Sequence, residues 1–315
     1  MLCREDAVGP HNSSVDNSGN ASVSDQVPAR DFEQMQSVEP QQLLSLIDTM
    51  QAELDKLRDD QSRARYQAQR VEEELRLAAR LQRDFLPKSL PNHGRVRFNR
   101  LYIPAGHVSG DLYDVRRLDE KWAGVYLADA IGHGMPAALL AMFLHNALVT
   151  KRIDISTAPG YHLLGSELAM QSLNESLCAQ GLQHATFATA LYARVNFDTG
   201  DIDLSRAGHP YPMLIRAGGK VEEVGEDGAL LGILPDETFT PYHTRLEPGD
   251  KLICFTDGVE TAFKPDDAVS DMQYWRDLIA EHRHLRADEL LSTLWHLRDG
   301  KPAEDDVTVV TIEMQ

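Results

Sequence analysis

An apolar pattern of helical period runs through residues 41–86 without a single Gly or Pro. Its seam positions are spaced alternately by four and three residues, and all are apolar except Gln61 and Gln82. They are Leu43, Ile47, Met50, Leu54, Leu57, Gln61, Ala64, Ala68, Val71, Leu75, Ala78, Gln82 and Phe85. Acidic and basic residues fill the other faces, which is typical of a coiled coil about six heptads and roughly 65 Å long.

We therefore predict a coiled-coil helix over residues 39–88 that forms a homodimer, in which the two seam glutamines lower stability and fix the register. The alternative is a long helix that packs on its own globular domain. A small domain would cover only part of the long, narrow apolar stripe of this helix, and this favours self-association. The pattern leaves open whether the coiled coil regulates the rest of the chain or only dimerises it.

Composition excludes several classes of partner. Residues 1–38 are rich in Ser, Asn, Asp, Gly and Gln without apolar periodicity, which predicts a disordered tail. The net charge of −18 argues against binding to nucleic acid or to an anionic membrane. Three separate cysteines form no disulfide framework, and no apolar run is long enough to span a bilayer. We expect a cytoplasmic protein.

Beyond Pro87 and Pro91 the pattern becomes mixed, and we predict a single domain over residues 92–315. Short alternating runs predict strands at residues 96–102, 113–118, 122–127, 189–196, 201–206, 212–216, 252–255 and 307–313. Helical blocks are expected at residues 135–151, 160–180, 270–284 and 287–298. Hairpin-linked strands with grouped helices indicate an α+β layered sandwich.

Acidic residues recur where a predicted strand ends or a turn begins. The four places are Ser109-Gly110-Asp111, Asp129-Ala130-Ile131-Gly132-His133, Thr256-Asp257-Gly258 and Glu304-Asp305-Asp306. Each Asp alone is explained equally well as a turn residue or a helix cap. Carboxylates gathered at one sheet rim repel one another and persist together mainly around hard cations. Oxygen ligands favour magnesium, manganese or calcium over zinc.

These motifs, in this order, resemble those of the PPM-type metal-dependent Ser/Thr protein phosphatases, in their bacterial SpoIIE-like, stress-response branch. Further matches are the helix around Glu74–Leu86, the turn at Ala207-Gly208-His209-Pro210, the element at Leu230-Leu231-Gly232 and the turn at Pro248-Gly249-Asp250. The resemblance covers about residues 74–315. It implies an αββα sandwich of two antiparallel sheets flanked by helices, with a centre of two Mn²⁺ or Mg²⁺ ions.

By resemblance, the metal ligands are Asp111, Asp129, Asp257, Asp305 and the carbonyl of Ala130. Asp129 would bridge the two ions, and Asp306 is the less favoured member of its pair. The family implies hydrolysis of phosphoserine or phosphothreonine on a regulatory protein, with an anti-sigma factor antagonist as the expected substrate. This chain departs from the family in carrying Ser109 where a second glycine is usual.

Two metal ions would lower the pKa of a bridging water and offset the charge of the phosphate, so that no Cys or Ser nucleophile is required. Protonation of the leaving alkoxide needs an acid, for which His133 is the candidate and His209 is expected to be structural. One rival interpretation is a catalytically weak phosphatase-fold scaffold that binds a phosphoprotein as a dimer. A calcium-binding module is another, although the chain lacks a dense D-x-D-x-D-G loop.

Overall fold

The computed structural model describes residues 39–315 except 157, 183–185, 266–270 and 299, so the predicted disordered tail lies outside the described residues. The chain divides at Gln67 and Ala68 into two units. Helix α2 (Pro40–Phe85) is continuous, as the absence of Gly and Pro predicts. No described helix combines the length and the apolar character needed to cross a membrane.

The seam residues in the first half of α2 are solvent-exposed. Leu54 and Leu57 are 50% and 59% exposed, and Leu43, Ile47 and Met50 are exposed to a similar degree. An apolar row of this length on a single helix has the pattern of a coiled-coil contact face. The helix is confirmed, and its assembly into a dimer stays a prediction.

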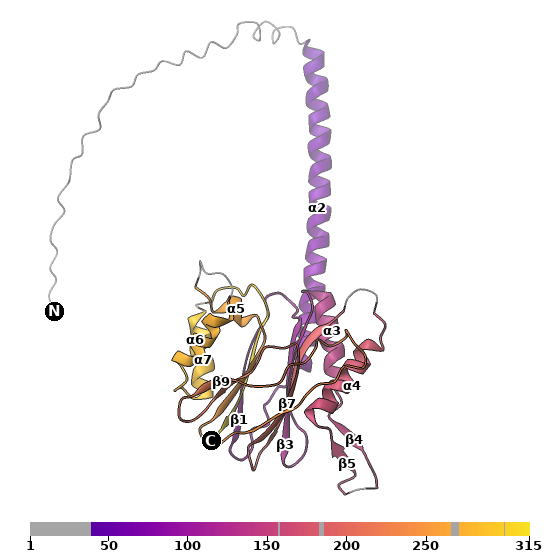
Figure 1. The fold of residues 1–315 in the computed structure, drawn as a ribbon. Helices are drawn as coiled ribbons and strands as arrows, with labels where there is room; N and C mark the ends of the chain where they lie inside the picture. The colour runs from indigo at the N-terminus through magenta and orange to yellow at the C-terminus, as the bar shows by residue number, and fades with distance from the viewer. Residues whose placement is uncertain (1–38, 157, 183–185, 266–270, 299) are drawn as a thin grey trace, which may run out of the picture. The chain divides into compact units, whose positions relative to one another are not determined.

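Residues 96–314 form two five-stranded antiparallel sheets, and the predicted fold class is confirmed (Figure 1). The first sheet has the order β1-β12-β11-β8-β9 and the second the order β10-β7-β6-β3-β2. The strands of the first are β1 (Val96–Ile103), β12 (Val307–Met314), β11 (Lys251–Phe255), β8 (Met213–Ile215) and β9 (Val221–Glu223). Those of the second are β10 (Tyr242–Arg245), β7 (Asp201–Ala207), β6 (Ala188–Asn196), β3 (Trp122–Ala130) and β2 (Asp111–Arg117).

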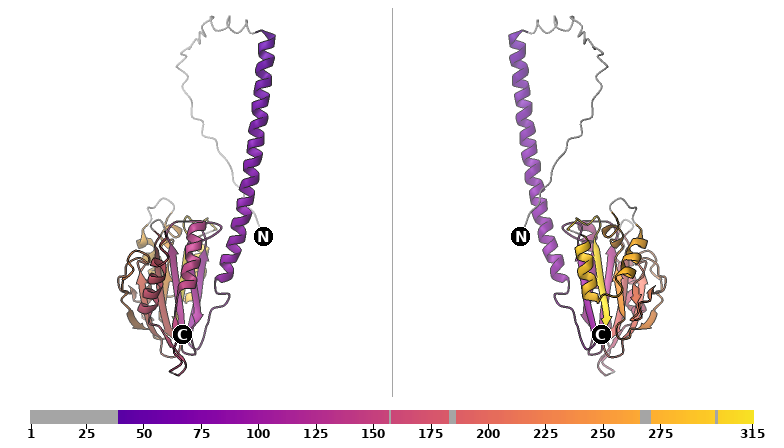
Figure 2. Two further views of the ribbon diagram at one scale, coloured as in Figure 1. Left: turned by 90° about the vertical axis from the view of Figure 1, so that its right-hand side faces the viewer. Right: turned by 90° about the vertical axis from the view of Figure 1, so that its left-hand side faces the viewer.

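Helices cover the outer faces of the two sheets (Figure 2). Helices α3 (Met135–Ala147) and α4 (Ser166–Cys178) pack on the second sheet. Helices α6 (Met272–Glu281) and α7 (Ala287–Leu297) join the core of the first sheet through Trp275 and Leu294, and the short α5 (Val259–Ala262) follows β11. The inner faces share one large apolar core, and helices cover the outer face of β12, so this strand is buried along its whole length.

Some predicted boundaries were wrong. The helix expected at residues 160–180 begins only at Ser166, after a hairpin of β4 (Lys151–Ile153) and β5 (Tyr161–Leu163). The helix expected to reach residue 151 ends at Ala147. Strands β4, β5, β9 and β10 have only three or four residues, too few for a period-two pattern to stand out in the sequence.

If α2 forms a coiled coil, replacing Leu54 and Leu57 together with Asp will convert a dimer into a monomer, because both charges would enter the apolar seam. Light scattering coupled to size-exclusion chromatography measures the mass. The control is Ala52→Asp with Ser62→Asp, which adds the same charge at exposed positions off the seam. A dimer that survives the double Leu replacement would contradict the coiled-coil prediction.

Candidate metal centre

The sheet registers bring the acidic motifs to one rim between the sheets. Asp111, the first residue of β2, is paired with Asp129 on β3, and Asp129 is paired with Thr189 on β6. Asp257 follows the end of β11, and Asp305 stands just before β12. Because β11 and β12 are antiparallel neighbours, the end of one and the start of the other meet at the same edge.

A cavity of about 720 Å³ opens at this rim. Its lining includes the carboxylates of Asp129, Asp257, Glu304, Asp305 and Asp306. Among the described residues that line it there is no Lys or Arg. The remaining lining residues are Leu75, Ala105, Gly106, His107, Val108, Ala130, Ile131, Gly132, His133, Gly134, Phe187 and Thr189.

Asp111 lies behind this cavity, 2% exposed. Its Oδ2 accepts hydrogen bonds from the hydroxyls of Thr256 and Thr308, both at 2.6 Å. Burial, and then the nearby charge of Asp129, raise the pKa of Asp111 well above its usual value, and the two threonine bonds oppose this shift. The buried carboxylate is thus held in place by the opposite sheet.

The carboxylates of the cavity lie close enough to raise one another's pKa values. Burial raises the pKa of Asp129 to about 7, with further contributions from the charges of Asp257, Asp305 and Asp306. Burial and the charge of Asp305 also raise the pKa of Asp257. A raised pKa means that the folded protein disfavours these carboxylates in their charged form unless a cation compensates them.

The donor set fits a hard divalent cation. It consists of carboxylate and carbonyl oxygens without thiolates, which suits Mg²⁺ or Mn²⁺ better than Zn²⁺. In the described part of the chain, no three His, Cys, Asp or Glu side chains stand close enough to form a complete ligand set by themselves. Mg²⁺ retains several water ligands and binds through few carboxylates, so an open cavity of this kind is compatible with it.

The structure separates the roles of the two neighbouring acids in the fourth motif. Asp306 is buried and accepts hydrogen bonds from the backbone N–H groups of Ala105 at 2.7 Å and Gly110 at 2.8 Å, one on each carboxylate oxygen. Asp305 is exposed, and its Oδ1 accepts the N–H of the adjacent Asp306 at 2.8 Å. Asp305 is therefore the member of the pair whose carboxylate is available to bind a cation, while Asp306 holds the backbone.

Gly110 permits the close approach of β2 and β3 beside the cavity. A Cβ atom at this position would lie 3.0 Å from the carbonyl oxygen of Ala130 and 3.2 Å from the Cβ of Ala137. The Gly110 carbonyl also accepts the N–H of Ala130 at 3.2 Å. Glycine is needed here for space, whereas the unusual Ser109 is accommodated because its hydroxyl accepts the N–H of Asp111 at 3.1 Å.

Comparison with known proteins identifies this arrangement. Residues 119–315 match the family described as Stage II sporulation protein E. The chain belongs to the SpoIIE family. The resemblance seen in the sequence motifs is thereby confirmed.

Relatives of this SpoIIE family chain include two curated bacterial proteins. It is 26% identical over 249 residues to the phosphoserine phosphatase RsbU of Bacillus subtilis, covering 78% of this chain and 71% of RsbU. It is 25% identical over 263 residues to the protein IcfG of Synechocystis, covering 76% of this chain but only 41% of IcfG. The fold is shared with the SiaA PP2C domain of Pseudomonas aeruginosa, with a TM-score of 0.64, 20% identity and coverage of 79% of this chain and 98% of that domain.

The histidines of this SpoIIE family domain occupy different environments. His133 is exposed and lines the carboxylate cavity, as does His107, which the sequence patterns did not single out. His209 is 1% exposed, and its Nδ1 lies 2.8 Å from the hydroxyl of Thr189. Burial, and then the charge of Arg206, lower the pKa of His209 to about 3. His209 is therefore neutral near pH 7 and cannot donate a proton as an imidazolium, which agrees with its expected structural role.

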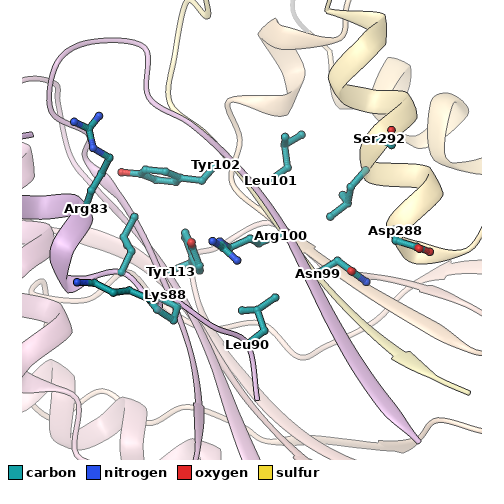
Figure 3. A pocket seen from close by; sticks show the side chains of 13 residues that line it. Arg83, Lys88, Leu90, Asn99, Arg100, Leu101, Tyr102, Tyr113, Asp288 and Ser292 are labelled. Carbon is teal, nitrogen blue, oxygen red and sulfur yellow. The ribbon is translucent and has the colours of Figure 1, made fainter. Parts of the chain in front are cut away.

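A larger cavity of about 870 Å³ lies elsewhere on the domain, between the end of α2, strand β1 and helix α7 (Figure 3). Arg83, Lys88 and Arg100 line it together with two tyrosines, and the Arg100 guanidinium lies 5.8 Å from the ring centre of Tyr113. Its only acidic lining residue among those described is Asp288. A single carboxylate among three described cationic side chains is a poor set of ligands for a divalent cation, so the smaller cavity is the candidate metal centre.

The separate roles of Asp305 and Asp306 are testable. Asp305→Asn will remove a cation ligand without loss of fold, so Mn²⁺ binding measured by calorimetry will weaken while the melting temperature in EDTA stays near that of the wild type. Asp306→Asn will lower the free energy of unfolding by about 1–3 kcal/mol, because a buried acceptor of two backbone N–H groups is altered. Equal loss of Mn²⁺ binding with unchanged stability in Asp306→Asn would reverse the assignment.

Proposed function

We propose that the chain is a Mn²⁺- or Mg²⁺-dependent protein phosphatase that hydrolyses phosphoserine or phosphothreonine on a regulatory protein. The observation that carries the proposal is the cavity in which Asp129, Asp257 and Asp305 meet without a neighbouring described Lys or Arg, in a domain of the SpoIIE family. The relative RsbU, named a phosphoserine phosphatase, supports the same chemistry.

The proposed cation ligands are Asp111, Asp129, Asp257, Asp305 and the carbonyl of Ala130. Asp129 lies in the cavity, across the strand pair from Asp111 and near Asp257 and Asp305, which suits a carboxylate shared between two ions. Asp111 is anchored by Thr256 and Thr308, so its orientation is fixed before any cation arrives. Such preorganisation favours tight and selective binding.

When bound, two divalent cations would supply compensation of the phosphate charge and a lowered pKa for a water that attacks phosphorus. The chain itself then has three tasks. The carboxylates would bind the cations, and the loop around Gly132 and Gly134 shapes the wall of the cavity. His133 lies at that wall, where it would give a proton to the leaving serine oxygen. Attack by water in this scheme requires no covalent nucleophile from the chain.

We infer that the substrate is a folded regulatory protein, with an anti-sigma factor antagonist as the expected class. Support comes from the likeness to RsbU, of which this chain spans 71%. A homodimer through α2 and a cytoplasmic location, both inferred from the sequence, belong to the same proposal.

The function is tested by phosphate release from a phosphoserine peptide with and without Mn²⁺. Wild-type turnover will require the cation and will be abolished by EDTA. Asp129→Asn and Asp257→Asn will each lower kcat/KM more than about 100-fold, because a charged ligand is replaced by a neutral one. The control is Asp198→Asn at an exposed turn distant in sequence from the four motifs. Near-normal activity in either cavity variant would exclude the two-ion assignment, and no turnover by the wild type would favour a phosphoprotein-binding scaffold.

The role of His133 is tested by varying the leaving group. His133→Asn will lower kcat roughly 100-fold for a phosphoserine peptide, whose alkoxide must be protonated, and much less for p-nitrophenyl phosphate, whose phenolate departs unprotonated. His107→Asn, at the same cavity, is the matched control. An equal loss on both substrates would show that His133 acts in binding or folding and not as the acid.

A further inference from the structure

Gln82 makes an unusual pair of contacts near the end of α2. Its side-chain Nε2 donates to the carbonyl oxygen of Ser109 at 2.7 Å, and its Oε1 accepts the N–H of the same residue at 3.0 Å. The side chain is 6% exposed, and Gln82 and Ala79 are the only buried residues described for α2. The carboxamide therefore pairs with both backbone polar groups of a single residue, its N–H and its C=O, much as a residue of a neighbouring β-strand would.

This pairing corrects the role expected for Gln82. The heptad pattern placed it on the seam of a coiled coil, where it would fix register between two copies. In the structure its two polar groups are occupied by Ser109 of the same chain. The seam of α2 cannot include Gln82 while those bonds exist.

Small residues allow the last turns of α2 to come this close. Ala79 packs in one apolar cluster with Val108 and Ala138, and Ala78 lies against it. Val108 precedes Ser109, and Ala138 belongs to α3, the helix that follows the loop after Asp129. Longer side chains at these alanines would separate α2 from the loop and lengthen the Gln82 bonds.

The backbone of Ser109, which Gln82 holds, is connected to two proposed cation ligands. The hydroxyl of Ser109 accepts the N–H of Asp111 at 3.1 Å. The next residue, Gly110, accepts the N–H of Ala130 at 3.2 Å and donates its own N–H to Asp306 at 2.8 Å. One short backbone segment thus sets the start of β2 and the end of β3, and its neighbours in space are Gln82 on one side and Asp306 on the other.

We propose that Gln82 is a positioning residue of the metal centre, through which the end of α2 fixes the backbone that carries Asp111 and Ala130. The inference rests on the proposed function of that centre. Gln82 touches neither substrate nor cation. It acts through Ser109 and Gly110. Loss of its two hydrogen bonds therefore lowers the affinity for the cation, while kcat at saturating cation changes little.

The consequence is that the C-terminal turns of α2, which carry Ala79 and Gln82, belong to the same unit as the metal centre. A change that shifts the end of α2 reaches Asp111 through the two hydrogen bonds of Gln82 and the backbone of Ser109 and Gly110. Divalent cations such as Mg²⁺ demand near-ideal geometry, so small displacements of a ligand lower their affinity.

The test is calorimetric titration of the full-length protein with Mn²⁺ for wild type, Gln82→Met and Gln69→Met. Methionine keeps the length and burial of the side chain and removes both hydrogen bonds. Gln69→Met makes the same change at an exposed position of α2 and is the matched control. We expect Gln82→Met to weaken Mn²⁺ binding roughly 10- to 100-fold, the range found when groups that orient metal ligands are lost. Gln69→Met should bind as the wild type does.

A second readout separates positioning from general destabilisation. Phosphatase assays over a Mn²⁺ series should show a raised half-maximal Mn²⁺ concentration for Gln82→Met, with kcat restored toward wild type at saturating Mn²⁺. If Gln82→Met does not fold, Gln82→Leu takes its place, because it also removes both hydrogen bonds to Ser109 and adds no charge beside the acidic cavity. Folded Gln82 variants with wild-type Mn²⁺ titrations would overturn the inference.

The experiments distinguish a failure of the proposed function from a failure of the role proposed for Gln82. If the wild type binds Mn²⁺ but releases no phosphate, the enzymatic assignment falls while the calorimetric comparison still decides the role of Gln82. If Gln82→Met and wild type bind Mn²⁺ equally and both are active, only the positioning role falls.

Discussion

The buried carboxylate of Asp111 joins the two sheets from within. It begins β2 of one sheet and accepts hydrogen bonds from Thr256 and Thr308 of the other, at the ends where β11 finishes and β12 starts. These bonds satisfy one of its oxygens and fix the distance between the sheets at this rim. They also hold a buried carboxyl group directly across the strand pair from Asp129, where burial disfavours negative charge on either residue. The interaction that aligns the sheets is therefore also the one that creates a demand for cations.

The acidic residues near this rim have two different roles. Asp306 has both oxygens engaged by backbone N–H groups and serves to hold the segment before β2. Asp305 stands beside it in the cavity with a largely free carboxylate. Asp114, three residues after Asp111, lies on the opposite face of β2. There it pairs with Arg116 and faces His145 of α3 at 3.6 Å, so its role is structural. A carboxylate can serve the site only if it faces the rim and keeps one oxygen free for a cation.

Local pattern was sufficient where the signal was long or repeated. The uninterrupted helix α2 and the long strands β1, β3, β6 and β12 follow from period and composition. The acidic motifs stood out because each combines a strand end with a turn. The short strands β9 and β10 were missed, since their formation depends on pairing with β8 and β7 and not on their own residues. His107 was missed because nothing in its local sequence separates it from an ordinary loop histidine.

The sequence by itself determined the secondary structure of the long elements and singled out the acidic motifs, because each element and each motif consists of residues close together along the chain. Only the tertiary structure decided which groups meet. The bond from Gly110 to Asp306 spans 196 residues, and the bonds of Gln82 to Ser109 span 27, so no local pattern encodes either. For Gln82 the difference reverses the interpretation. Heptad spacing places it on a seam between two helices, whereas burial of a polar amide requires hydrogen-bond partners, which the N–H and C=O groups of Ser109 supply.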